Sequence, residues 1–64
     1  MLIRDLLNLV DYPDDVRIEI YSYAIYDNIF CGSIEELELR NSDLLDSKIS
    51  GLEFPKTNCV IINI

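Results

Sequence analysis

The chain has 64 residues, which is enough for one small domain and too few for two. Half of the residues are hydrophobic, so the chain is not a disordered acidic tail, and no apolar run approaches the ~20 residues that cross a membrane. Twelve acidic residues against five basic ones give a formal net charge of -7, which repels nucleic acid phosphates and anionic membranes. We therefore expect a soluble, folded protein that binds neither nucleic acid nor membrane directly.

The first expected element is a short amphipathic helix over about residues 2–10. Its hydrophobic residues recur at spacings of three and four, namely Leu2, Ile3, Leu6, Leu7 and Val10. Pro13 disfavours helix at the preceding residue, so a turn follows. The turn contains Asp11, Asp14 and Asp15, which we interpret as solvated, with a weak divalent-cation site as the alternative. The run lacks the ligand spacing, the glycine and the terminal glutamate of an EF-hand loop.

From residue 16 the hydrophobic period changes to two, which predicts a strand. One strand face carries aliphatic side chains and the other carries polar and aromatic ones: Val16, Ile18 and Ile20 against Arg17, Glu19, Tyr21 and Tyr23. Asp27 and Asn28 tolerate left-handed turn conformations, so we expect a hairpin turn there and a second strand over residues 29–31. A turn near Ala24 is the alternative register.

A second helix is expected to begin after Ser33, whose hydroxyl can cap it while Glu36 reaches back in a capping box. Its inward-facing residues are expected to be Ile34, Leu37 and Leu39. Residues 41–46 then predict a capped turn or a single helical turn.

Two further strands, over residues 49–54 and 58–64, are separated by a turn at 55–58 and form a second predicted hairpin. The last strand is apolar on both faces, so it should be central or covered. The expected fold class is α+β, with residues 1–64 forming a single small domain. Its expected architecture is one mainly antiparallel sheet of about four strands with two short helices, in the order α-β-β-α-β-β.

The composition excludes most catalytic chemistry. The chain has no histidine, so a Ser–His or Cys–His nucleophile cannot be assembled and the commonest neutral metal ligand is missing. A pair of catalytic carboxylates would need a concave, partly dry pocket, which a chain this short rarely encloses. The chain also has no glycine-rich phosphate loop and no paired-cysteine zinc motif. We expect no enzyme activity, no cofactor and no metal.

The cysteines and the N-terminal residues indicate a reducing compartment. Cys31 and Cys59 are interpreted as small buried hydrophobic residues, with a bridge or a reactive thiol as the alternative. Residues 1–5 carry mixed charge and no long apolar run follows them, unlike a signal peptide. The expected location is the cytoplasm.

Two sets of surface residues are candidates for binding a partner. The acidic set comprises Asp14, Asp15, Glu35, Glu36, Glu38, Asp43 and Asp46. These carboxylates either keep the domain soluble or imitate a nucleic-acid backbone and occupy the basic groove of another protein. The second set comprises Glu19, Tyr21, Tyr23 and Tyr26. Tyrosine is favoured at protein interfaces, so these rings either form a dimer or partner face or are covered by the helices as a second small core.

Several segments resemble small proteins carried by phages and prophages of low-GC Gram-positive bacteria, and together they span most of the chain. They are the helix Ile3-Arg4-Asp5-Leu6-Leu7, the strand Asp15-Val16-Arg17-Ile18-Glu19-Ile20-Tyr21, the middle Ile29-Phe30-Cys31-Gly32-Ser33-Ile34-Glu35-Glu36-Leu37 and the end Val60-Ile61-Ile62-Asn63-Ile64.

This resemblance implies a host-directed stoichiometric inhibitor, of the anti-CRISPR or another anti-defence type, that binds a protein with a basic surface such as a host defence nuclease complex. An antitoxin is a variant of the same interpretation. The alternative function is a homodimeric structural or assembly module with no nucleic-acid-related target.

Overall fold

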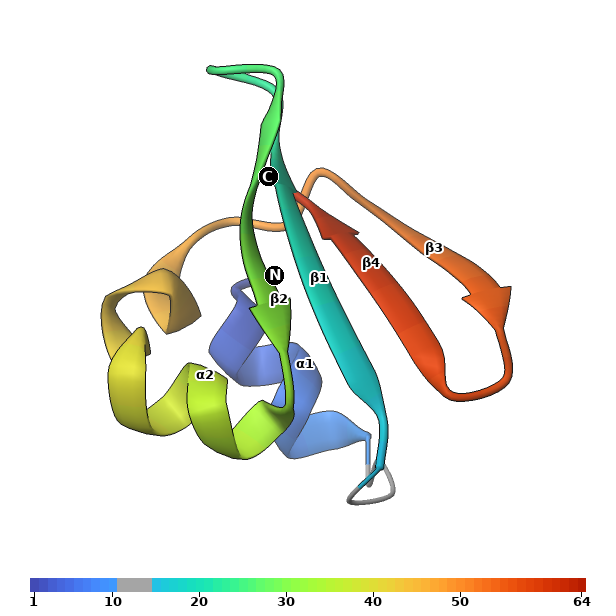
Figure 1. The fold of residues 1–64 in the computed structure, drawn as a ribbon. Coiled ribbons are helices and arrows are strands. Elements are labelled where there is room, and N and C mark those ends of the chain that lie inside the picture. Colours follow the sequence, from blue (N-terminus) through green and yellow to red (C-terminus); the bar gives the residue numbers. More distant parts are fainter. Residues whose placement is uncertain (11–14) are drawn as a thin grey trace.

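The computed structural model describes residues 1–10 and 15–64. Figure 1 shows the elements, which are α1 (Ile3–Leu9), β1 (Arg17–Ser22), β2 (Asp27–Gly32), α2 (Ile34–Arg40), the 3-10 helix η1 (Ser42–Asp46), β3 (Gly51–Lys56) and β4 (Cys59–Asn63). The predicted α+β class and the order α-β-β-α-β-β are confirmed.

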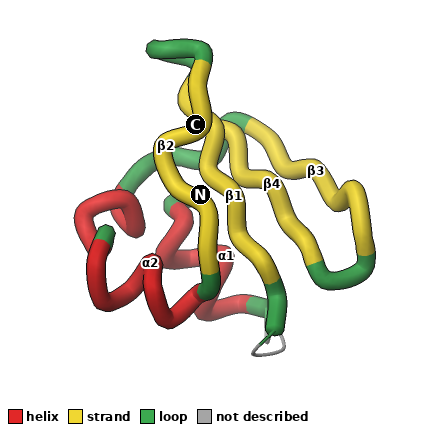
Figure 2. The backbone as a smooth tube through the Cα atoms, viewed as in Figure 1, coloured by secondary structure: helices red, strands yellow, loops and turns green. Residues whose placement is uncertain are grey.

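The strands form one four-stranded sheet in the order β2-β1-β4-β3 (Figure 2). The pairs β1/β2 and β3/β4 are antiparallel, whereas the central pair β1/β4 is parallel, so the sheet is mixed. Beyond the paired strands, the Ile64 amide donates to the Tyr21 carbonyl and the Tyr23 amide donates to the Ile64 carbonyl, each over 2.9 Å. The predicted central place of the last strand is confirmed.

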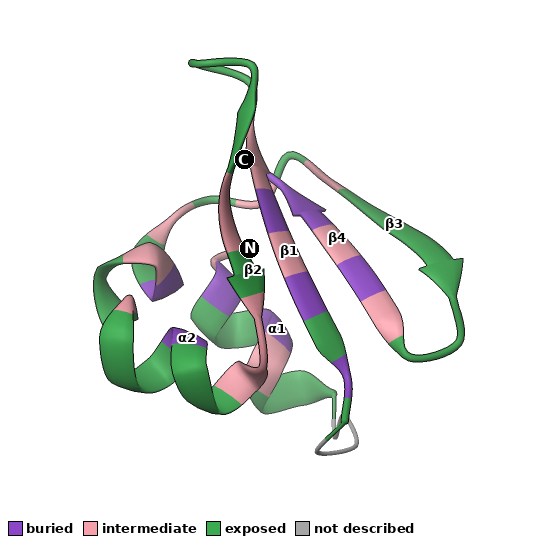
Figure 3. Cartoon of the chain, viewed as in Figure 1, coloured by how far each residue is buried: buried purple, intermediate pink, exposed green. Residues whose placement is uncertain are grey.

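The hydrophobic core lies between one face of the sheet and the helices α1, α2 and η1 (Figure 3). Ile18 and Ile20 on β1 lie directly beside Val60 and Ile62 on β4. The helices cover this strip with side chains that are themselves buried, namely Ile3 and Leu6 from α1, Leu37 from α2 and Leu45 from η1. The alternation predicted for the first strand therefore selects the face that the helices cover, and Val60 and Ile62 of β4 lie on the same face.

The start of α2 follows the predicted cap. The Ser33 hydroxyl accepts a hydrogen bond from the Glu36 amide over 3.2 Å and donates to Glu36 Oε1 over 3.4 Å. Leu37 is fully buried, but the expectation that Leu39 faces inward is wrong, because that side chain is 75% exposed. Two helical residues span about 200° around the axis, so Leu37 and Leu39 point to opposite sides.

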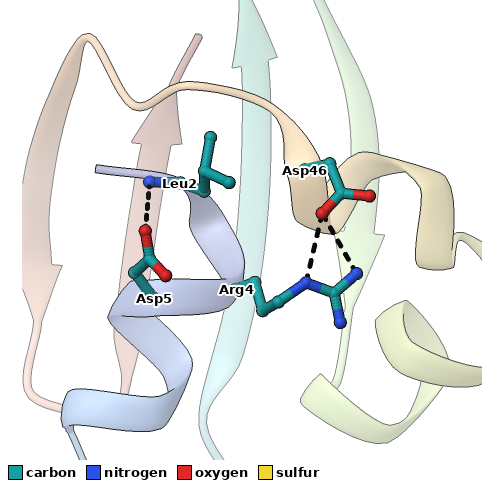
Figure 4. Close-up of polar contacts among 4 residues, drawn as sticks. All are labelled: Leu2, Arg4, Asp5 and Asp46. Atoms are coloured by element: carbon teal, nitrogen blue, oxygen red, sulfur yellow. Dashed lines mark hydrogen bonds and ion pairs between the residues drawn. The ribbon is translucent and has the colours of Figure 1, made fainter.

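The N-terminal helix is tied to the segment that leads into β3. The Asp5 carboxylate accepts from the Leu2 amide over 3.0 Å at the start of α1. The Ile3 amide donates to the Ser47 carbonyl and the Ile49 amide donates to the Met1 carbonyl. Arg4 on α1 pairs with Asp46 on η1 at 3.1 Å (Figure 4).

The predicted hairpin turn at Asp27 and Asn28 is wrong, because both residues lie in β2. The turn spans residues 23–26, as the alternative register proposed. With a turn at 27–28, residue 26 would pair with residue 29. The second strand, predicted to end at residue 31, would then be too short to reach the buried Ile18 and Ile20 of β1. The observed register instead pairs Ile18 with Gly32 and Ile20 with Phe30. Hydrophobic burial thus outweighs the local preference of Asp and Asn for turns.

Removal of the α2 cap is expected to destabilise the whole domain. Ser33→Ala leaves the Glu36 amide without its acceptor, so the free energy of unfolding should fall by about 1 kcal/mol. Urea denaturation measures this change. Ser42→Ala, at an exposed position of η1, is the matched control and should change stability by less than about 0.5 kcal/mol. Equal effects of the two substitutions would contradict the role given to the cap.

Candidate binding surface

The face of the sheet opposite the helices is covered by none of the described elements, and we call it the open face. The strand register gathers on it Arg17, Glu19 and Tyr21 from β1, Asn28 and Cys31 from β2, Glu53 and Lys56 from β3, and Cys59, Ile61 and Asn63 from β4. This mixture of charged, amide and aromatic side chains differs from the aliphatic residues of the covered face.

One half of the open face is a shallow acidic trough with a volume of about 350 Å³. It is lined by Glu19, Tyr21, Tyr23, Asn28, Glu53, Ile61 and Asn63. Ile61 on the inner strand β4 lies between Glu19 on β1 and Glu53 on β3, so a carboxylate flanks it on each side. Asn63 is only 5% exposed, and its Nδ2 donates to Glu53 Oε2 over 3.3 Å. This hydrogen bond holds the Glu53 carboxylate at the edge of the trough.

Two tyrosine rings form one end of the trough. The rings of Tyr21 and Tyr23 are 5.4 Å apart with planes at 77°, an edge-to-face pair of the kind that aromatic quadrupoles favour. Tyr21 is half-buried and Tyr23 is exposed. The interpretation in which the helices cover these rings as a second core is wrong, because α1, α2 and η1 pack on the opposite face. The rings are therefore available to a partner.

The other half of the open face carries positive charge. A hollow of about 540 Å³ is lined by Arg17, Glu19, Pro55, Lys56, Asn58, Cys59 and Ile61. Cys59 pairs with Arg17 on one side and with Lys56 on the other, so a cation lies on each neighbouring strand. Glu19 stands between the two halves, with its carboxylate oxygens 3.8 Å from Cys31 Sγ and 4.0 Å from Cys59 Sγ.

The expected burial of both cysteines is wrong, since Cys31 is exposed and Cys59 is half-buried, and both thiols are free. Their positions in the strands place them on the open face. Cys31 lies on β2 and Cys59 on β4, on opposite sides of β1. Two strand spacings, about 9.5 Å, separate such residues, whereas a disulfide needs Cα atoms within about 7 Å.

Five of the six acidic candidates that the structure describes lie away from the open face, and the sixth, Asp15, lines a hollow with Arg17 and Glu36. Glu35, Glu36 and Glu38 are on α2, Asp43 and Asp46 are on η1, and Asp15 precedes β1. All six are exposed, but Asp46 is paired with Arg4 and Glu36 is engaged in the helix cap. Asp14 lies outside the described residues. The acidic candidates and the tyrosine candidates therefore belong to different surfaces.

The candidate Tyr26 is the last residue of the hairpin turn that begins at Tyr23, and it does not line the trough. It is 79% exposed at the tip of the hairpin, which projects beyond the rest of the sheet (Figure 1). Its φ of 55° lies in the left-handed region, which is uncommon for a residue with a side chain. Tyr26 and the neighbouring exposed Ile25 thus form a surface of their own.

Sequence reasoning missed the residues that β3 and β4 contribute to the trough, above all Glu53, Ile61 and Asn63. The alternation of the last strand could have placed Ile61 and Asn63 on one face. No local signal could have placed them beside Glu19, because that depends on the parallel pairing of β1 with β4.

Within residues 1–10 and 15–64, no three acidic or cysteine side chains are arranged to hold a metal ion. The cation interpretation of Asp11, Asp14 and Asp15 falls largely outside this part of the chain. No helix in it has the length and apolar character needed to cross a membrane.

Comparisons with models of protein families, with curated proteins and with solved structures find no match for this chain. The surfaces of the domain are therefore the basis on which a function can be inferred.

Replacement of Tyr26 by glycine is expected to preserve or raise stability. Glycine adopts a positive φ without the cost of about 1–2 kcal/mol that a side chain incurs there, and its greater freedom in the unfolded chain offsets part of this gain. Thermal or urea unfolding of Tyr26→Gly should show a free energy between unchanged and about 1 kcal/mol higher. The contrasting variant Tyr26→Val should be destabilised. A large loss of stability in Tyr26→Gly would show that the ring is needed for packing.

Proposed function

We propose that this chain is a non-catalytic protein-binding module that acts by occupying a surface of its partner. The observation that carries the proposal is the one-sided arrangement of the fold, with helices on one face of the sheet and an open face that presents Tyr21, Tyr23 and Ile61. Tyrosine supplies a large contact area with a polar tip, and interfaces are enriched in it. A shallow, open surface of this kind suits a protein partner better than a small substrate.

The partner is expected to carry a basic surface. The formal net charge of -7 attracts cationic proteins over long range and speeds their association. The exposed carboxylates of Glu35 and Glu38 on α2 and of Asp43 on η1 add to this field. The carboxylates contribute to the rate of association and to the choice of partner more than to the final affinity.

The specific form that we propose is a phage-encoded inhibitor acting in the host cytoplasm. Proteins that handle nucleic acids present basic grooves, which an acidic protein can fill in place of the phosphate backbone. The proposed target is accordingly a host nucleic-acid-handling or defence complex of the CRISPR type. The support is the acidic charge together with the resemblance of the sequence to small phage and prophage proteins.

A homodimeric assembly module is the second candidate, and one observation favours it. The open face has an acidic half with Glu53 and a basic half with Arg17 and Lys56. A two-fold axis can place the acidic half of one copy over the basic half of the other, which makes the surface self-complementary. In this case Tyr21 and Tyr23 would be buried between the two sheets.

The two candidates predict different masses in solution. A protein-binding module is expected to elute as a monomer of 7.4 kDa in size-exclusion chromatography with light scattering. A stable species of twice that mass, whose dissociation follows charge reversal at Lys56, would support the homodimer instead. The same measurement at high salt separates a charge-dependent dimer from an apolar one.

The inhibitor proposal is tested by affinity capture of a host nuclease complex on the immobilised whole chain. Binding should weaken as salt rises from about 50 to 200 mM, because the association is steered by charge. The combined variant Glu35→Lys and Glu38→Lys should capture less of the complex, whereas Arg40→Gln on the same helix is the control that does not weaken capture. Capture that is insensitive to both salt and charge reversal would contradict an electrostatic partner.

A further inference from the structure

We propose that the acidic half of the open face receives an arginine side chain of the partner protein. The inference rests on the proposed protein-binding function and deepens it, because it assigns the contact to the trough and names the chemistry of the occupant. The trough combines carboxylates, aromatic rings and an apolar floor. A guanidinium group on an aliphatic stem matches all of these features.

The negative charge of the trough is the first feature that suits an arginine. Glu19 and Glu53 flank Ile61 from the two neighbouring strands. Neither forms a salt bridge with any of the described residues; Arg4 and Asp46 form one on the far side of the domain. Arg17 lies on the same strand as Glu19, but its guanidinium contacts Cys31 Sγ. Cys31 Sγ is also 3.8 Å from Glu19 Oε1, so Arg17 lies close to Glu19, whereas Glu53 accepts only from the Asn63 amide among the described residues. Glu53 is thus the carboxylate of the trough that a positive group from a partner would compensate.

The shape of the trough is the second feature that suits an arginine. The floor of the trough is Ile61, a suitable surface for the methylene groups of a long side chain. Tyr21 and Tyr23 present rings in two nearly perpendicular planes, and a guanidinium can stack on an aromatic face. Asn63 donates an amide hydrogen to Glu53, and the exposed Asn28 side chain in the trough has an oxygen that can accept a further N–H group.

The spacing of the acceptors in the trough favours arginine over other cations. Glu19 and Glu53 lie on strands two spacings apart, about 9.5 Å between their backbones. A guanidinium has five N–H donors directed outward in one plane, so it can donate to groups on two sides. This geometry predicts that arginine binds better than lysine.

The experiment titrates two blocked peptides of equal charge, one containing arginine and one containing lysine, into the ¹⁵N-labelled whole chain. Amide shifts should move at Glu19, Tyr21, Glu53, Ile61 and Asn63, and the arginine peptide should bind about threefold or more tightly than the lysine peptide. Equal affinity of the two peptides, or shifts confined to α2 and η1, would overturn the inference.

Matched variants separate the trough from the overall negative charge. Glu53→Gln keeps an oxygen for the Asn63 hydrogen bond and removes one carboxylate, so arginine affinity should fall about threefold. Glu35→Gln on α2 makes the same chemical change on the opposite side of the domain and should change affinity by less than about twofold. Glu19→Gln is the second trough variant and should weaken arginine binding less than Glu53→Gln, because Arg17 lies close to Glu19; each variant is used only with a wild-type-like amide spectrum.

Failure of the inference can be told from failure of the proposed function. If Glu35→Gln weakens peptide binding as much as Glu53→Gln, arginine recognition by the trough is overturned, while an acidic protein-binding module remains supported. If neither peptide binds at low salt, the arginine site is overturned. The salt-dependent capture of a host complex then decides the proposed function independently.

Discussion

The parallel pairing of β1 with β4 is the interaction on which the rest of the structure depends. Each hairpin alone would be marginal in water, and this pairing joins them into one four-stranded sheet. It sets Ile18 beside Val60 and Ile20 beside Ile62, which forms the strip that the helices cover. On the opposite face the same register places Glu19 beside Ile61, so one pairing creates both the core and the trough.

The described elements cover only one face of this sheet. The short helices α1 and α2 and the single turn of η1 supply the buried side chains of one layer, and nothing described remains to cover the second face. A half-covered antiparallel sheet normally exposes polar residues, and the open face does so with charges and amides. Tyr21, Tyr23 and Ile61 add aromatic and apolar surface to this face that solubility does not require. This excess makes the open face, rather than the acidic helices, the best candidate for a specific contact.

In the proposed function, the charged residues would act from two different surfaces. Exposed carboxylates on α2 and η1 set the long-range field, and some of them also serve the fold, as Glu36 does in the cap and Asp46 in its pair with Arg4. Glu19 and Glu53 are only two carboxylates, but they line a hollow that Tyr21 and Tyr23 also line. Under the proposed function, long-range attraction and short-range recognition would therefore be separable and would belong to opposite sides of the domain.

The sequence by itself determined the local elements, because their causes are local. The period of two through Ile18 and Ile20 specified a strand, and Ser33 with Glu36 specified the start of α2. Only the tertiary structure decided the hairpin register, in which burial overrode the turn preference of Asp27 and Asn28, and the parallel contact between the hairpins. The trough was undetectable for the same reason: all four strands contribute to it, from residues as far apart in the sequence as Glu19 and Asn63, and long-range packing sets which of them are neighbours.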